Sequence, residues 1–300
     1  MWLVFALGSA LFAGTTAVLA KLGVRDVDSN LATALRTVVV AVLAWLMVLV
    51  SGSQSTLDQL SAHTWLFLIL SGLATGASWL CYFKALQVGD INKVVPVDKS
   101  STVLAMILAV VFLGEPVNAL VVASMASIGV GTFLMIERQP RLSVPPAPDV
   151  RKDEPGGQRV AGWAWLVYAA GSALFAALTA ILGKIGIEGV DSTLGTAIRT
   201  IVVLVMAWLI VLAQSTHHQL LAVDRSSWVF LTLSGVTTGL SWLCYYRALQ
   251  EGPASVVVPI DKLSILVTIG VGAVVFHERL SARAGIGLAL IVTGTLALIV

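Results

Sequence analysis

Two short segments of this chain place an acid beside a base within apolar sequence. Residues 94–101 read VVPVDKSS and residues 257–264 read VVPIDKLS. An ionisable side chain inside a membrane span costs about 3 kcal/mol to insert, so such a residue is a candidate for substrate binding or proton transfer. A carboxyl group in a site of low dielectric can hold a proton near neutral pH. The candidate substrate or ion-pathway residues in these segments are Asp98, Lys99, Asp261 and Lys262.

A proline stands two residues before each of these aspartates. If the helix begins near Ile91, Pro96 lies inside it, removes a backbone donor and kinks the helix. In the alternative, the helix starts at Pro96, and Asp98 lies in the first turn, where its charge offsets the helix dipole. We predict Pro96 and Pro259 as the kink residues.

The composition indicates an integral membrane protein. Of the 300 residues, 58% are hydrophobic and 11% are charged, and the mean hydropathy of +0.94 is too high for a soluble domain. Apolar stretches of roughly 20 residues can cross a hydrocarbon layer of about 30 Å. Helices are expected, because a backbone in lipid must satisfy its own hydrogen bonds, and a β-barrel would show short alternating strands. Ten spans are predicted, at residues 2–22, 31–50, 65–86, 91–113, 117–136, 165–185, 194–213, 228–249, 254–276 and 280–299.

The chain contains a tandem duplication. A shift of 163 positions aligns residues 2–136 with residues 165–299 without a gap, and nearly half of the aligned residues are identical. We predict a first repeat at 1–137, a solvated linker at 138–162, and a second repeat at 163–300. Because five spans are an odd number, the second repeat must lie inverted, as in many secondary transporters. The predicted fold class is an all-α integral membrane protein with ten transmembrane helices in two inverted five-helix repeats.

Loop charges give an orientation. Basic residues concentrate on the side of the linker, and this side is cytoplasmic by the positive-inside rule, which puts both termini outside. Where the copies differ, positive charge moves to the same side: Arg25 corresponds to Glu188, and Lys93 to Val256. The basic residues on the linker side are Lys21, Arg25, Lys84, Lys93, Arg138, Arg141, Arg151, Lys152, Arg159, Arg225, Arg279 and Arg283, and those on the other side are Lys184 and Arg247.

Other charges occur in both copies, so they face opposite sides and topology does not explain them. These pairs are Lys21/Lys184, Arg36/Arg199, Lys84/Arg247, Asp98/Asp261, Lys99/Lys262 and Glu115/Glu278. The first and third pairs close helices and are explained best as snorkelling anchors. The glutamates end the fourth span of each half and either pair with a basic residue or sit in the interface. Arg36 and Arg199, flanked by threonines roughly 8 Å or less below a helix start, either line a pathway or anchor the helix.

The third span of each half carries a polar stripe. Ser71, Thr75, Ser78 and Tyr82 fall on one helical face, and the second copy repeats this pattern. Glycines in the same spans form GxxxG steps, so close helix packing is the alternative to pathway lining. Trp79 and Trp242, in the same spans, either stack on a substrate or pack in the core or interface. Outside the two Asp-Lys segments, at residues 94–101 and 257–264, the candidate pathway residues are Arg36, Ser78, Trp79, Tyr82, Arg199, Ser241, Trp242 and Tyr245.

The sequence contains no phosphate-binding loop, dinucleotide-binding glycine pattern, HExxH or nucleophile motif. No metal-ligand spacing is present either. We therefore expect no enzyme activity, no cofactor, no metal site and no nucleic-acid partner.

Three segments carry a family resemblance: SWLCYFKALQ at 78–87, PVDKSS at 96–101 and FLGE at 112–115. With the five-span unit, they resemble the EamA family of the drug/metabolite transporter superfamily, and in particular small bacterial proteins made of one such unit. The second copy departs from the pattern at FLGE, where it reads VFHE. The resemblance implies a secondary transporter of the bacterial inner membrane, often an exporter, with helices of both halves around a central cavity approached by the fourth and ninth helices.

The leading hypothesis is a secondary active transporter, acting as an exporter of small polar metabolites such as amino acids or organic anions by alternating access. Its partners are a small-molecule substrate, the lipid bilayer and protons, which Asp98 and Asp261 are candidates to carry. The alternative is a flippase for lipid-linked intermediates, with Lys21, Arg36 and Lys84 contacting phosphate, or a non-transporting membrane partner protein.

Overall fold

A computed structural model describes residues 1–23, 27–88, 91–135, 163–275 and 281–299, and these residues form helices without strands. The helices of the first half are α1 (Trp2–Gly23), α2 (Ser29–Ser51), α3 (Ala62–Val88), α4 (Ile91–Lys99), α5 (Ser101–Leu113) and α6 (Ala119–Met135), with the 3₁₀ helix η1 (Ser53–Gln59). Those of the second half are α7 (Ala164–Gly186), α8 (Ser192–Ala213), α9 (Arg225–Glu251), α10 (Ala254–Lys262), α11 (Ser264–Val275) and α12 (Ala282–Ala297), with η2 (Thr216–Ala222). The predicted linker lies outside the described residues.

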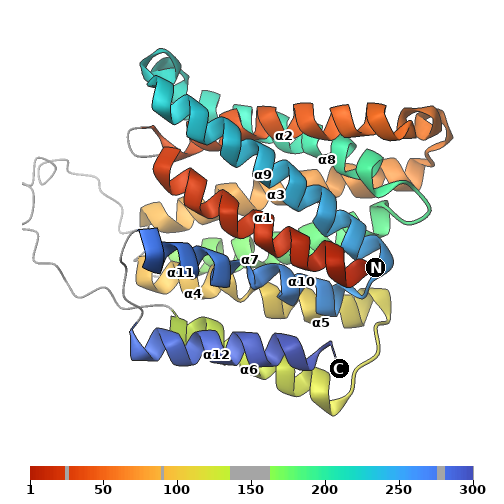
Figure 1. The fold of residues 1–300 in the computed structure, drawn as a ribbon, viewed down its shortest axis with the longest axis vertical. Helices are drawn as coiled ribbons and strands as arrows, with labels where there is room; N and C mark the ends of the chain where they lie inside the picture. The colour runs from red at the N-terminus through yellow and green to blue at the C-terminus, as the bar shows by residue number, and fades with distance from the viewer. Residues whose placement is uncertain (24–26, 89–90, 136–162, 276–280, 300) are drawn as a thin grey trace, which may run out of the picture.

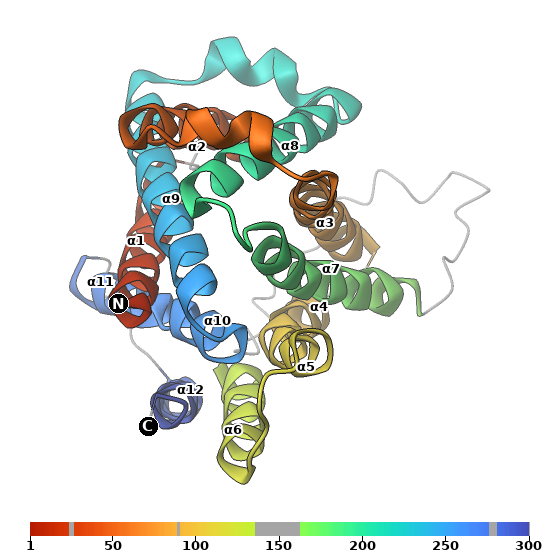
Figure 2. The same ribbon diagram turned by 90° about the vertical axis from the view of Figure 1, so that its right-hand side faces the viewer.

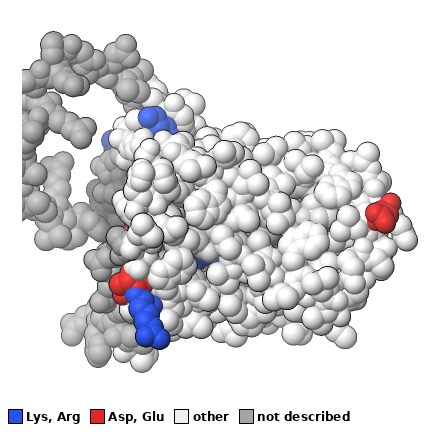
Figure 3. Space-filling view, turned by 90° about the horizontal axis from the view of Figure 1, so that it is seen from above, with Lys and Arg blue, Asp and Glu red and all other residues white. Residues whose placement is uncertain are grey.

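The helices form a bundle with an apolar waist. In Figure 1 they run across the view, with both termini at one end of the bundle. In Figure 3 most charged side chains lie at the left end of the bundle, an acidic side chain lies near the right end, and the band between them is almost entirely uncharged. Eight described segments are long and apolar enough to cross a membrane, and α6 and α12 are shorter apolar helices. The prediction of an all-α membrane protein is confirmed, and each of the ten predicted spans corresponds to one helix or one split helix.

The fourth span of each half is the split one. The first half breaks between α4 and α5 and the second between α10 and α11, in each case directly after the Asp-Lys pair. At the breaks the amides of Ser100 and Leu263 bond to carbonyls three residues earlier, a 3₁₀-type tightening. Because α10 begins five residues before Pro259, the proline is inside the helix, and α4 likewise begins at Ile91. The alternative of a helix starting at the proline is therefore wrong, and the kink stays a prediction.

The two halves pack crosswise. Helix α3 packs on α7 and α1 packs on α9, while α2 meets α8 and α6 meets α12. The contacts of α5 with α7 and of α1 with α11 are also equivalent when the halves are exchanged. Seen end-on in Figure 2, α1 and α9 lie on one side of the centre and α3 and α7 on the other. Each half therefore supplies walls to a shared centre.

Glycines bring the third span of one half against the second span of the other. A Cβ atom at Gly72 would lie 2.6 Å from the Cβ of Val202, and one at Gly76 would lie 2.7 Å from the Cβ of Met206. The second copy repeats this closeness, at Gly235 against Val39, 2.6 Å away. The predicted close packing at the GxxxG steps is confirmed. It places α8 beside the polar stripe of α3.

One retained acid pair, which the sequence analysis did not single out, has a structural explanation. Asp28 and Asp191 are the N-caps of α2 and α8, and each accepts hydrogen bonds from two backbone amides of its own helix. Retention of a charge in both copies therefore does not by itself indicate a transport role.

We predict that Gly72→Ala destabilises the protein by about 1–3 kcal/mol, because the added methyl group forces α3 away from α8. Gly270→Ala is the matched control, since a Cβ atom there meets nothing within 4 Å. Thermal unfolding of both variants in detergent checks this. Equal melting temperatures would show that the α3–α8 contact is not tight.

Candidate functional site

A cavity of about 280 Å³ lies between the halves. Helices α1 and α3 of the first half contribute to its walls, as do α7, α8, α9 and α10 of the second. Its lining residues are Ala13, Thr75, Ser78, Trp79, Ala176, Thr179, Ala180, Arg199, Ser241, Trp242, Tyr245, Tyr246, Asp261 and Lys262. The cavity is thus lined by hydroxyls, aromatic rings and three charged groups, and it is small compared with pockets for drug-sized ligands.

Arg199 is the most deeply buried charge of the cavity, at 2% exposure. Its Nε donates to Ser71 Oγ at 3.3 Å and its Nη2 donates to Thr75 Oγ1 at 3.0 Å. Both acceptors belong to the stripe that the Gly72 and Gly76 contact holds against α8. Among the described residues, no carboxylate lies within salt-bridge distance of this guanidinium. Its charge is therefore met by neutral hydroxyls and rings.

Two aromatic rings hold the guanidinium in place. Its carbon lies 4.4 Å from the ring centroid of Tyr246 and 5.1 Å from that of Trp242. A cation at such a distance from a ring is attracted by the ring quadrupole. A guanidinium has five N–H donors, and the two bonds to α3 use one on Nε and one on Nη2. The remaining donors, two on Nη1 and one on Nη2, form an end that can grip a planar anion with two parallel hydrogen bonds.

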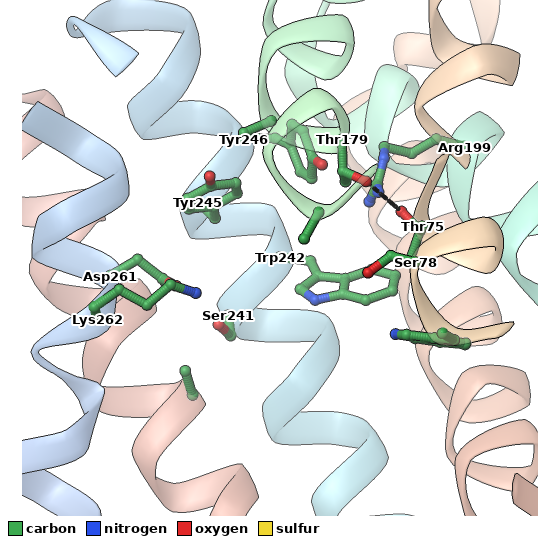
Figure 4. A pocket seen from close by; sticks show the side chains of 14 residues that line it. Thr75, Ser78, Thr179, Arg199, Ser241, Trp242, Tyr245, Tyr246, Asp261 and Lys262 are labelled. Carbon is green, nitrogen blue, oxygen red and sulfur yellow. Dashed lines mark hydrogen bonds and ion pairs between the residues drawn. The ribbon is translucent and has the colours of Figure 1, made fainter. Parts of the chain in front are cut away.

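Asp261 and Lys262 form another wall of the cavity. Figure 4 shows them across from Arg199 and Thr75, with Tyr245 and Trp242 between. Asp261 Oδ1 accepts a hydrogen bond of 2.6 Å from Ser9 Oγ, and Ser241 Oγ donates to the Ser9 carbonyl at 3.1 Å. The Lys262 ammonium lies 3.7 Å from Asp261 Oδ2. The Asp-Lys pair of the second half thus lies at the cavity, and its aspartate is held in place by the Ser9 hydroxyl of the first half.

The Asp-Lys pair of the first half has the equivalent hydrogen bonds, but Asp98 and Lys99 do not line the cavity. Ser172 Oγ donates to Asp98 Oδ1 at 2.6 Å, and Ser78 Oγ, which lines the cavity, lies 3.4 Å from Ser172 Oγ. Asp98 therefore connects to the cavity through two hydroxyls. Each aspartate thus accepts a hydrogen bond from a serine that also contacts a serine of the third span in the other copy. Asp261 lines the cavity itself, whereas Asp98 is connected to it by the two serine hydroxyls.

The structure brings many of the predicted pathway residues together and leaves others apart. Those that line the cavity are Ser78, Trp79, Arg199, Ser241, Trp242, Tyr245, Asp261 and Lys262, and those that do not are Arg36, Tyr82, Asp98 and Lys99. Arg36 Nε is buried and has no hydrogen-bond partner among the described residues. Lys99 is exposed, and its ammonium lies 4.0 Å from Asp98 Oδ2.

Sequence reasoning missed Tyr246 and Thr179. Tyr246 corresponds to Phe83 of the first copy, so it is not among the residues that both copies share. Thr179 corresponds to Thr16, so its retention in both copies was a usable signal. Its hydroxyl lies 3.3 Å from that of Thr75.

The anchoring residues behave differently from one another. Lys84 is exposed and donates to Gln87, and Arg247 pairs with Glu251 one turn away, as expected of residues at a membrane surface. Lys184 is not a snorkelling anchor, because its ammonium binds Glu115 at 3.1 Å and the Gly252 carbonyl at 2.7 Å. Of the two expectations for Glu115, the structure shows the pairing with a basic residue. The side chain of Lys21 and all of Glu278 lie outside the described residues.

Comparisons with known proteins give a consistent result. The EamA-like transporter family matches residues 1–137 and 163–300, as expected of a tandem duplication. A Sinorhizobium protein described as "Uncharacterized transporter in cobO 3'region" is 46% identical over 134 residues, which are 45% of this chain and 95% of that protein. A solved structure described as "Crystal structure of protein" superposes with a TM-score of 0.74, and the match covers 98% of this chain and 95% of the chain in that structure. At 17% identity this likeness shows the fold alone.

Proposed function

Because the chain belongs to the EamA-like transporter family, and is thus a multi-pass membrane transporter, we propose that it carries small metabolites bearing a carboxylate by alternating access. We propose that it exports these metabolites and has no enzymatic activity. The observation that supports it most is the burial of Arg199 at the cavity without a carboxylate partner among the described residues.

A buried cation is costly unless an anion compensates it. Hydroxyls and aromatic rings offset part of this cost at Arg199, and a substrate carboxylate would supply the missing charge. The three donors left on the guanidinium suit two-point binding of one carboxylate. The rings of Trp79, Trp242 and Tyr245 offer apolar surface for the remainder of the molecule. The substrate class is therefore amino acids or short organic acids.

We propose protons as the coupling ion, carried by Asp261 at the cavity and by Asp98 behind it. The serine hydroxyls between Asp98 and the cavity give a short path for a proton. A carboxyl group there can bind a proton in one state and release it in another as its exposure to water changes.

We propose that the protein resides in the inner membrane of a bacterium with its linker in the cytoplasm. The excess of Lys and Arg on the linker side supports this orientation. The common position of the two termini fits an even number of crossings (Figure 1).

Arg199→Gln is expected to weaken carboxylate binding at least tenfold, because hydrogen bonds to charged groups contribute about 1.5–3 kcal/mol. A thermal-shift screen of purified protein with amino acids and short organic acids, each beside its amide, measures this. Arg199→Lys should restore binding only in part, since an ammonium lacks the planar fork. Arg247→Gln is the control, as that arginine pairs with Glu251 outside the cavity. Unchanged binding of the acids by Arg199→Gln would refute the substrate class.

The double variant Asp98→Asn, Asp261→Asn is expected to lose uptake driven by a proton gradient in proteoliposomes, while exchange of substrate across the membrane persists. Asp261→Asn alone should have the larger effect, because its carboxylate faces the cavity. Asp58→Asn, at an exposed position in η1, is the control. Gradient-driven uptake at the wild-type rate in the double variant would rule out both carboxylates as proton carriers.

Reporter domains that are active only outside the cytoplasm are expected to be active at both the N-terminus and the C-terminus, and inactive when inserted in the linker. Activity in the linker fusion alone would invert the proposed orientation.

A further inference from the structure

Glu115 joins the two halves at the end of the bundle where the termini lie. It follows α5 of the first half, and its side chain is 8% exposed. Its Oε1 accepts from the Ala254 amide at 2.6 Å and its Oε2 accepts from the Ser255 amide at 2.8 Å. Both amides belong to the first two residues of α10, the helix that places Asp261 and Lys262 in the cavity wall. One carboxylate of the first half thus holds the start of a cavity helix of the second.

The arrangement is a helix cap supplied by another part of the fold. The N-cap position of α10 is Pro253, which makes no side-chain capping bond. In contrast, α2, α8 and α9 are each capped by the aspartate that directly precedes them. The first amides of a helix need acceptors, and a negative charge there is favoured by the helix dipole. Since α10 has no cap of its own, it depends on Glu115.

Lys184 of α7 strengthens the same junction. Its ammonium lies 3.1 Å from Glu115 Oε1 and donates to the Gly252 carbonyl at 2.7 Å, so it bridges the carboxylate and the chain that enters α10. Burial opposes ionisation of Glu115, but the hydrogen bonds from Ser255 and Ala254 and the charge of Lys184 outweigh it and lower the pKa of this carboxyl. The junction is therefore intact at neutral pH.

The junction lies beyond the cavity toward the terminus end, on two of its walls. On α10, Ala254 precedes Asp261 by seven residues, which is about 10 Å along the helix axis. On α7, Lys184 follows the cavity residue Ala180 by four residues, about 6 Å along the axis. Helices α7 and α10 are thus tied together between the cavity and that face of the membrane.

We propose that Glu115, Lys184 and the start of α10 form a latch that closes the terminus side of the substrate pathway, and that this latch opens when the cavity becomes accessible from that side. The proposal rests on the alternating access proposed above. It assigns Glu115 and Lys184 a gating role that does not require them to touch the substrate.

Access to a cysteine in the cavity tests the latch. Ala176→Cys on α7 is placed in a background of Cys81→Ser and Cys244→Ser, which removes the two native thiols. A membrane-impermeant methanethiosulfonate reagent is applied to sealed vesicles of each orientation, with a tag on the N-terminus identifying the face. Glu115→Gln is expected to raise the labelling rate from the terminus face at least tenfold, because the neutral side chain has one acceptor oxygen for the two α10 amides and no charge to attract Lys184. Labelling from the opposite face should fall.

Glu251→Gln is the matched control, because that glutamate lies at the same end but pairs, within the part of the chain that the structure describes, with Arg247 of its own helix. It should leave both labelling rates unchanged. The reversed pair Glu115→Lys, Lys184→Glu should also label rapidly from the terminus face, since a cation cannot accept hydrogen bonds from the α10 amides. Slow labelling of this reversed pair would overturn the capping role.

Labelling of Glu115→Gln at the background rate from the terminus face would overturn the latch, and so would faster labelling from both faces, which indicates general loosening. The substrate proposal is tested separately, because labelling needs no substrate. Carboxylate binding by the wild-type protein, with no change in the labelling of Glu115→Gln, counts only against the latch. A change in labelling without carboxylate binding by the wild-type protein counts only against the proposed substrate.

Discussion

Lipid offers no hydrogen-bond partner, so each polar group within the spans has to be satisfied inside the protein. Much of the centre of this molecule follows from that constraint. Serines of α3 and α9 find acceptors in the opposite half, since Ser71 donates to the Thr179 carbonyl and Ser234 donates to the Thr16 carbonyl. Thr75 and Thr238 also donate to carbonyls one turn earlier in their own helices. Glycines in the same helices let the backbones approach closely enough for the bonds between the halves to form. The polar lining and the interlocking of the halves are therefore one arrangement.

Hydropathy and the internal duplication predicted the helical fold and the position of nearly every helix, because a length of about 20 apolar residues is a property of the chain alone. From Pro96 and Pro259 a kink was predicted within a continuous fourth span, whereas the structure divides this span in each half three residues after the proline. The crosswise contacts were not predicted, since they depend on which faces of α1 and α3 meet the other half. Several residues of α8, α9 and α10 that line the cavity could be picked out as candidates, because ionisable and hydroxyl residues are conspicuous in apolar sequence; their role in a pathway stays a prediction.

The sequence was least informative about whether residues that the two repeats share occupy equivalent positions in the structure. The duplication suggested that each retained pair acts as a pair, yet Arg199 lines the cavity and Arg36 does not. The same holds for Asp261 and Asp98. In this conformation the two copies have different surroundings, so equivalent residues do not occupy equivalent positions around the cavity. The difference between Tyr246 and Phe83 adds a permanent asymmetry, since only the former can place a phenol beside the arginine.

Crosswise packing also has a consequence for the assembly of the protein. The surfaces of α1 and α3 are completed by helices of the second repeat, so one repeat on its own would leave them bare and would have to find an inverted copy by diffusion in the membrane. Joining the two repeats in one chain makes this encounter intramolecular, and its probability then depends on the reach of the linker instead of the amount of protein in the bilayer. Once the partner is always present, the two copies no longer need to remain interchangeable. Each can then specialise for the side of the membrane that it faces.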